Sequence, residues 1–78
     1  MAEPEENFVI TIPSTLVDTI VPRIKPTLNA YRAVSTGNQF GCGVAEYFFA
    51  VDPKRVNGLR RALINKVNNP QITFELMK

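Results

Sequence analysis

The chain has 78 residues, of which 45% are hydrophobic, and this fits one small globular domain. It contains no His and a single Cys, so the sequence excludes an intrachain disulfide and the common zinc sites. The net charge of +2 conceals an asymmetry, because Glu3, Glu5 and Glu6 all lie near the start. We expect residues 1–7 to form a flexible acidic tail and residues 8–78 to form the domain.

Nothing in the sequence directs the protein to a membrane. The first residues are acidic and lack the apolar stretch of a signal peptide. The longest apolar run, Tyr47 to Val51, is far shorter than the roughly 20 residues that span a bilayer. We expect a soluble protein that is cytoplasmic, or otherwise intracellular, or part of a virion.

The first elements are a strand and a helix. Phe8, Ile10 and Ile12 alternate with other residues, which predicts a strand that ends at Pro13. The sequence from Thr15 to Asp18 has the spacing of a capping box and predicts a helix over residues 15–21.

Two prolines and an ambiguous stretch follow. Pro22 lacks an amide hydrogen and is expected to break the helix, and a new segment is expected to open near Pro26. Residues 27–35 fit either a helix or a strand. Residues 35–43 contain three glycines and are predicted to be a turn region.

The second half of the chain has clearer patterns. Residues 44–51 predict a strand with one apolar face and one mixed face. Asp52 and Pro53 are typical of a helix start, and an apolar stripe extends the helix to about residue 67. Asn68 to Pro70 ends it, and the alternation over residues 71–77 predicts a last strand.

These elements predict an α+β fold. If residues 27–35 are a strand, the order is βαββαβ, a split βαβ arrangement; if they are helical, three strands remain. In both cases we expect a small single-layer sheet of three to four strands, antiparallel or mixed, with two helices on one face.

The sequence argues against catalysis. Cys42 lies between Gly41 and Gly43 but has no His to generate its thiolate. The glycines do not have P-loop spacing, and the few acids are too dispersed for paired acid–base chemistry or a metal site. We therefore predict a non-enzyme with no cofactor and no metal.

The mixed face of the strand over residues 44–51 is the first candidate site. Its members Val44, Glu46 and Phe48 are expected to point away from the helices. Exposed aromatic surface on a strand generally marks a partner. We therefore predict a protein-binding module that forms a homo-oligomer or is a subunit of a larger assembly.

The helix over residues 53–67 supports the alternative, a nucleic-acid-binding module. It has five basic residues and no acid, and these are the candidate phosphate contacts: Lys54, Arg55, Arg60, Arg61 and Lys66. At about 100° per residue these charges spread around three sides of the helix, which is more typical of a solvated surface.

Short segments of the chain resemble three known families. Phe8-Val9-Ile10 and Tyr47-Phe48-Phe49 resemble the aromatic strands of RNA-recognition motifs, but the basic-glycine-aromatic signature is absent and Glu46 lies where RNA would bind, so we reject this family. Residues 10–16 resemble the opening of ribbon-helix-helix proteins, but no suitable helix pair follows. Val21-Pro22-Arg23 resembles a motif of small phage-encoded proteins, which implies a virion component or an accessory factor and assigns no residue a role.

Overall fold

The computed structural model describes residues 6–77 and contains four strands and two helices. In chain order the elements are β1 (Glu6–Pro13), a 3-10 turn η1 (Ser14–Leu16), α1 (Val17–Ala30), β2 (Val34–Gly41), β3 (Val44–Val51), α2 (Pro53–Val67) and β4 (Thr73–Met77). The sheet order is β2-β3-β1-β4, and each neighbouring pair is antiparallel. This is the ferredoxin-like split βαβ arrangement, so the predicted α+β class is confirmed, with four strands.

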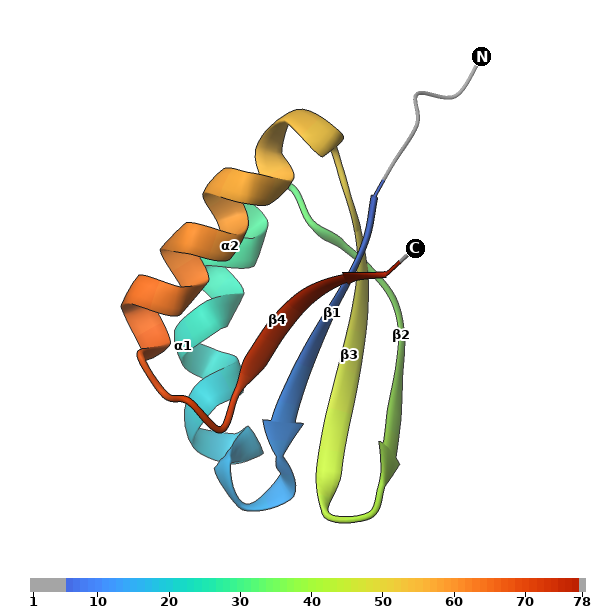
Figure 1. Cartoon of the computed structure of the whole chain (residues 1–78), viewed down its shortest axis with the longest axis vertical. Helices are drawn as coiled ribbons and strands as arrows, with labels where there is room; N and C mark the ends of the chain where they lie inside the picture. The colour runs from blue at the N-terminus through green and yellow to red at the C-terminus, as the bar shows by residue number, and fades with distance from the viewer. Residues whose placement is uncertain (1–5, 78) are drawn as a thin grey trace.

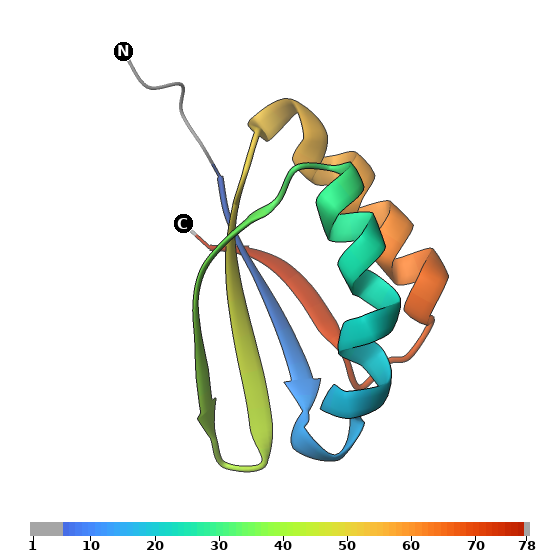
Figure 2. The ribbon, with the colours of Figure 1, turned by 180° about the vertical axis from the view of Figure 1, so that it is seen from behind.

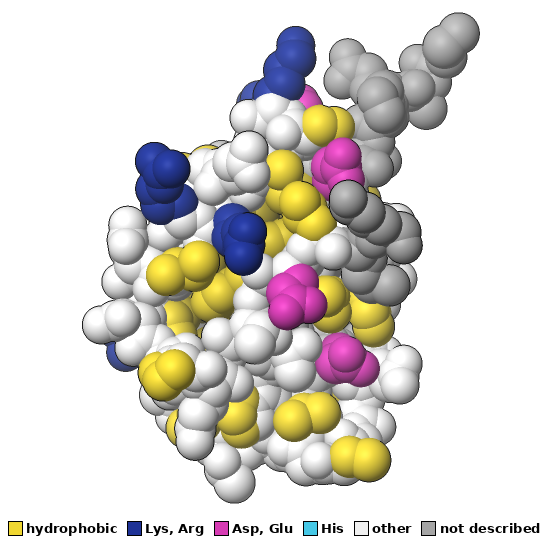
Figure 3. Space-filling model, viewed as in Figure 1, with side chains coloured by type: hydrophobic (Ala, Val, Ile, Leu, Met, Phe, Trp, Pro, Cys, Tyr) yellow, Lys and Arg dark blue, Asp and Glu magenta, His cyan; other side chains and the backbone are white. Residues whose placement is uncertain are grey.

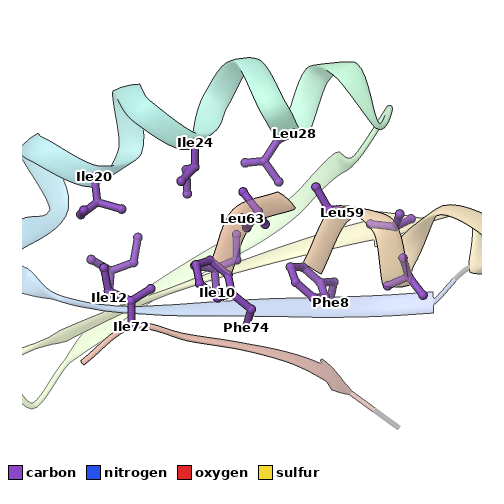
Figure 4. Close-up of a cluster of buried hydrophobic side chains, with 12 residues drawn as sticks. Phe8, Ile10, Ile12, Ile20, Ile24, Leu28, Leu59, Leu63, Ile72 and Phe74 are labelled. Carbon is purple, nitrogen blue, oxygen red and sulfur yellow. The ribbon is translucent and has the colours of Figure 1, made fainter. Parts of the chain in front are cut away.

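Both helices lie on the same face of the sheet (Figures 1 and 2). The core fills the space between these two layers and consists of Phe8, Ile10, Ile12, Ile20, Ile24, Leu28, Val51, Val56, Leu59, Leu63, Ile72 and Phe74. Figure 4 shows Ile20, Ile24 and Leu28 of α1 directed toward the strands. The rings of Phe8 and Phe74 stack across β1 and β4, with centroids 6.5 Å apart and planes at 14°.

The predicted break at Pro22 is wrong, since α1 continues through Pro22 and Pro26 to Ala30. Pro22, Pro26 and Asp18 are all exposed. Because the two prolines lack amide hydrogens, the carbonyls of residues 18 and 22 lose their helical partners, and on this exposed side they are accessible to water. An interior proline costs about 3 kcal/mol or more. Burial of Ile20, Ile24 and Leu28 contributes about 1.5–3 kcal/mol each, which is comparable with the combined cost of the two prolines and favours a continuous helix.

The two helices begin in different ways. The predicted capping box is wrong, because Thr15 lies inside η1 and neither η1 nor α1 has a side-chain cap. The chain turns immediately after β1, and the Ser14 amide donates to the Gly43 carbonyl at 2.9 Å. In α2 the expected cap is present, since Asp52 Oδ1 accepts a hydrogen bond from the Lys54 amide at 2.9 Å.

The largest correction concerns residues 27–41. Residues 27–30 complete α1, and the expected turn over residues 35–43 is mostly the strand β2. Only Cys42 and Gly43 form the turn, with φ angles of 54° and 77°. A register shift between Ser35 and Gly37 marks a bulge in β2.

Two strand boundaries also differ from those expected. Residues 1–5 of the predicted acidic tail lie outside the described residues, while Glu6 and Asn7 are the first residues of β1. At the other end, β4 begins at Thr73 rather than residue 71, although Ile72 is already buried in the core.

Candidate protein-interaction surface

We call the side of the sheet opposite the helices the bare face. The strand register decides which residues it contains, because paired residues of antiparallel strands point to the same side. Val9 pairs with Phe48, Thr11 with Glu46, and Pro13 with Val44, while Phe8, Ile10 and Ile12 point into the core. The structure therefore brings Val44, Glu46 and Phe48 together on the face expected from the sequence.

Val9 is the apolar centre of the bare face. It is only 9% exposed, although neither helix covers it, because Phe48 on β3 and Glu75 on β4 flank it as cross-strand partners. Phe48 is half-buried directly beside it on β3, and half-buried Ala50 is the next residue on the same side of that strand. Val44 is also half-buried but lies at the other end of β3, beyond Glu46. Val9, Phe48 and Ala50 therefore form a short apolar strip that retains surface for a contact.

The charges of the two layers differ in sign. No Lys or Arg occurs in any strand between residues 6 and 77, whereas Glu46 and Glu75 lie on the bare face on either side of β1. The basic side chains of this part of the chain belong to the two helices and to Arg32 in the turn after α1. The bare face consequently has an apolar strip around Val9 and Phe48, with one acid beside the strip on β3 and one on β4.

The outer edge of the sheet at β2 is a second surface, which the sequence did not predict. All eight residues of β2 are exposed, and Phe40 and Val34 remain 63% and 59% exposed. Phe40 makes one aromatic contact, an edge-on packing against Tyr47 with centroids 6.0 Å apart. No charged residue occurs between Ala33 and Ala45.

The short turn fixes which backbone groups of β2 face outward. In a hairpin with a two-residue turn, the flanking residues form a hydrogen-bonded pair, here Gly41 with Val44. Pairing then alternates, so Gln39 also bonds to β3 while Phe40 and Asn38 direct their amides and carbonyls away from the sheet. The outer edge therefore presents unpaired backbone donors and acceptors.

The basic residues predicted on α2 are all exposed: Lys54, Arg55, Arg60, Arg61 and Lys66. Arg60 and Arg61 line one shallow depression with Asn57 and Ile64. In Figure 3 the Lys and Arg side chains on that side form separate groups, divided by white and yellow atoms. The structure thus brings two of the five together and leaves the others dispersed.

Two larger hollows flank the helices. One of about 570 Å³ lies between α2 and β4, with Arg60 and Ile64 on the helix and Phe74 and Glu75 on the strand. The other, of about 400 Å³, lies between α1 and β3 and has Lys25 and Tyr47 in its wall.

Cys42 is exposed at the tip of the β2–β3 hairpin. From residue 6 to residue 77 there is no group of three His, Cys, Asp or Glu side chains able to hold a metal ion. In the same span, neither helix is both long and apolar enough to cross a bilayer.

Comparisons with known proteins identify a similar fold and do not indicate a function. No protein family matches the chain, and no curated protein matches its sequence. Among solved structures, the C-terminal domain of the MgtC protein from Mycobacterium tuberculosis is similar, with a TM-score of 0.60 over 99% of this chain and 93% of that domain. The sequence identity is 8%, so the likeness concerns the fold alone.

Proposed function

We propose that the chain is a non-catalytic protein-binding module that acts as a subunit of a larger assembly and binds a partner on the bare face. The observation that carries this proposal is the strip around Val9 and Phe48, which is apolar and lies on the side of the sheet that carries no helix. Soluble proteins usually cover such a sheet face with a second layer or use it for binding. The resemblance of Val21-Pro22-Arg23 to phage proteins supports an assembly role, including one in a virion.

The charges on the bare face define the chemistry of the partner. Glu46 and Glu75 flank the apolar strip, so a complementary surface has an apolar centre with Lys or Arg at its rim. A second copy docked face to face would place Glu46 and Glu75 against the same acids. We therefore assign this face to a different protein.

The test uses photo-crosslinking followed by reconstitution. A photoreactive phenylalanine analogue is placed at position 48, and at the exposed position Arg23 on α1 as the matched control. A protein that crosslinks only at position 48 is then purified, and its affinity for the purified chain is measured by calorimetry. We expect Phe48→Ser and Glu46→Lys to weaken binding at least tenfold, and Arg23→Ala to leave it unchanged.

Two results would contradict the proposal. One is equal crosslinking from both positions, which would show that the bare face has no preferred partner. The other is a reconstituted complex whose affinity does not respond to Phe48→Ser while the variant remains folded.

Nucleic-acid binding through α2 is the second candidate. The specific observation in its favour is the depression shared by Arg60, Arg61 and Asn57, which offers two cations and an amide to a phosphate. Lys54, Arg55 and Lys66 do not line this depression, which argues against a continuous footprint. The salt titration described in the Discussion separates this candidate from the first.

A further inference from the structure

The two edges of the sheet are protected to different degrees. The edge strand β4 has five residues and includes the charged Glu75. The other edge, β2, has eight residues and contains neither a charge nor a proline. Natural edge strands usually avoid pairing with other chains by means of short length, charge, proline or bulges, and of these β2 has only the bulge near Ser35.

We propose that two copies of this chain pair through β2, antiparallel and about a two-fold axis at Gln39, to form one continuous eight-stranded sheet. This interface lies at the outer edge of the sheet, where Gln39 borders the bare face beside Glu46, and it goes beyond the function proposed above. It buries the outer edge of β2 in both copies and leaves the two bare faces side by side on the same surface of the joined sheet.

The backbone supplies the pairing. Asn38 and Phe40 direct their amides and carbonyls outward. Asn38 of one copy can therefore exchange two backbone hydrogen bonds with Phe40 of the second copy, and Phe40 of the first copy can do the same with Asn38 of the second. The two Gln39 residues then face each other as a pair without direct hydrogen bonds. The bulge at Ser35 lies outside this segment, so the paired length is the regular stretch from Gly37 to Gly41.

Two features select a second copy as the occupant. An antiparallel match of β2 with itself places no like charges together, because the strand and its neighbours from Ala33 to Ala45 are uncharged. The pairing also uses one edge per copy, and the remaining edge at β4 is short and charged. The contact therefore closes as a dimer and does not propagate as a fibre.

The size of the contact sets its strength. Five paired residues and the ring of Phe40 bury less than the roughly 1,200–2,000 Å² of a stable interface, so we expect a weak dimer that forms only at high chain concentration. Sedimentation velocity over about 1–500 µM chain should therefore show the fraction of dimer rising with concentration.

Two variants test the edge itself. Asn38→Pro removes an outward amide and leaves the ladder to β3 intact, because proline is tolerated where an edge amide faces solvent. Gln39→Lys places two lysines against each other across the axis, and the same change at exposed Gln71 is the matched control. We expect the first two to weaken dimerisation at least tenfold and Gln71→Lys to leave it unchanged, with circular dichroism showing that each variant is folded.

A disulfide tests the register. In a Cys42→Ser background, Gln39→Cys should form a disulfide dimer in air, because facing residues of this kind have Cα atoms about 4.5 Å apart, within the range of a disulfide. Gln71→Cys in the same background should not.

Two results would overturn the proposal. One is a folded wild type that stays monomeric at 500 µM, and the other is a dimer whose dissociation constant is changed by neither Asn38→Pro nor Gln39→Lys. A monomer that still binds its partner through Phe48 would refute only the dimer and not the function proposed for the bare face.

Discussion

The two faces of strand β1 each contain a residue of low exposure, and the two residues become buried by different means. Phe8 and Val9 are adjacent, and they are 0% and 9% exposed. Phe8 is covered by the helix layer and stacks on Phe74, whereas Val9 is shielded only by its neighbours within the sheet. A low exposed fraction therefore does not distinguish a core position from the centre of a docking face, and substitutions can make that distinction.

The largest effect is expected for Phe8. Phe8→Ala removes a fully buried ring and leaves a cavity between the layers, at a cost of about 3–5 kcal/mol. Val9→Ala should cost less than half as much, because no second layer packs on it. Urea unfolding monitored by circular dichroism measures the free energy of unfolding of both variants. If Phe8→Ala does not fold, Phe8→Leu replaces it in the comparison. Equal losses at Phe8 and Val9 would mean that the bare face stabilises the fold as strongly as the core does.

The next effect compares two neighbouring aromatic residues of β3. Phe49 packs against the core and Phe48 lies on the bare face, although both are half-buried. Phe49→Ser places a hydroxyl against the core and should cost about 3 kcal/mol, whereas Phe48→Ser should cost about 1 kcal/mol. The midpoints of thermal unfolding provide the comparison. If both variants lost the same stability, the bare face would be a structural surface and would lose its role as a binding surface.

A smaller effect concerns the contact between the helices above the covered face. A Cβ added at Gly58 would lie 3.1 Å from Cε2 of Tyr31, which is tighter than ordinary packing. Gly58→Ala alone should therefore change stability little, because the gain of up to about 1 kcal/mol from helix propensity is offset by this contact. In a Tyr31→Ala background the same change should show that gain. A double-mutant cycle, measured by urea unfolding, isolates the interaction free energy between the added methyl group and Tyr31. A stability gain of equal size in both backgrounds would show that Tyr31 does not oppose a side chain at position 58.

The smallest effect is expected for Arg61, which is exposed on α2. Arg61→Ala should change stability by less than about 0.5 kcal/mol. We also expect no micromolar binding of single- or double-stranded nucleic acid at physiological salt. A fluorescence titration at two salt concentrations checks this. Binding that Arg61→Ala weakens, with the slope of the affinity against salt reduced by about one unit, would favour the nucleic-acid candidate.

Most of the fold follows from local patterns in the sequence. Alternation identified β1, β3 and β4, because each has one face against the core. Asp52 and Pro53 identified the start of α2, because its cap is formed within the segment itself. These elements were predictable since the residues that define them are close together in the chain.

The missed elements depend on what surrounds them. Residues 34–41 lack a periodic pattern because β2 packs on little and both of its faces are exposed. The path of α1 through Pro22 and Pro26 depends on the burial of its opposite side, which requires the finished sheet. The same limit applies to the candidate sites: alternation placed Val44, Glu46 and Phe48 on one face, but the exposed edge of β2 has no apolar signal. The local feature that indicates a β2–β3 hairpin is the two-residue turn at Cys42 and Gly43, which directly precedes the alternating strand β3.

The strand order has a consequence for how the protein is made. β1 is synthesised first, yet its two neighbours in the sheet are β3 and β4, and the ring that stacks on Phe8 belongs to the last strand. During synthesis Phe8, Ile10 and Ile12 therefore remain without their β4 partners until residues 73–77 have left the ribosome. The domain cannot complete its sheet before that point, and in the interval the apolar side of β1 is exposed to aggregation and to binding by chaperones.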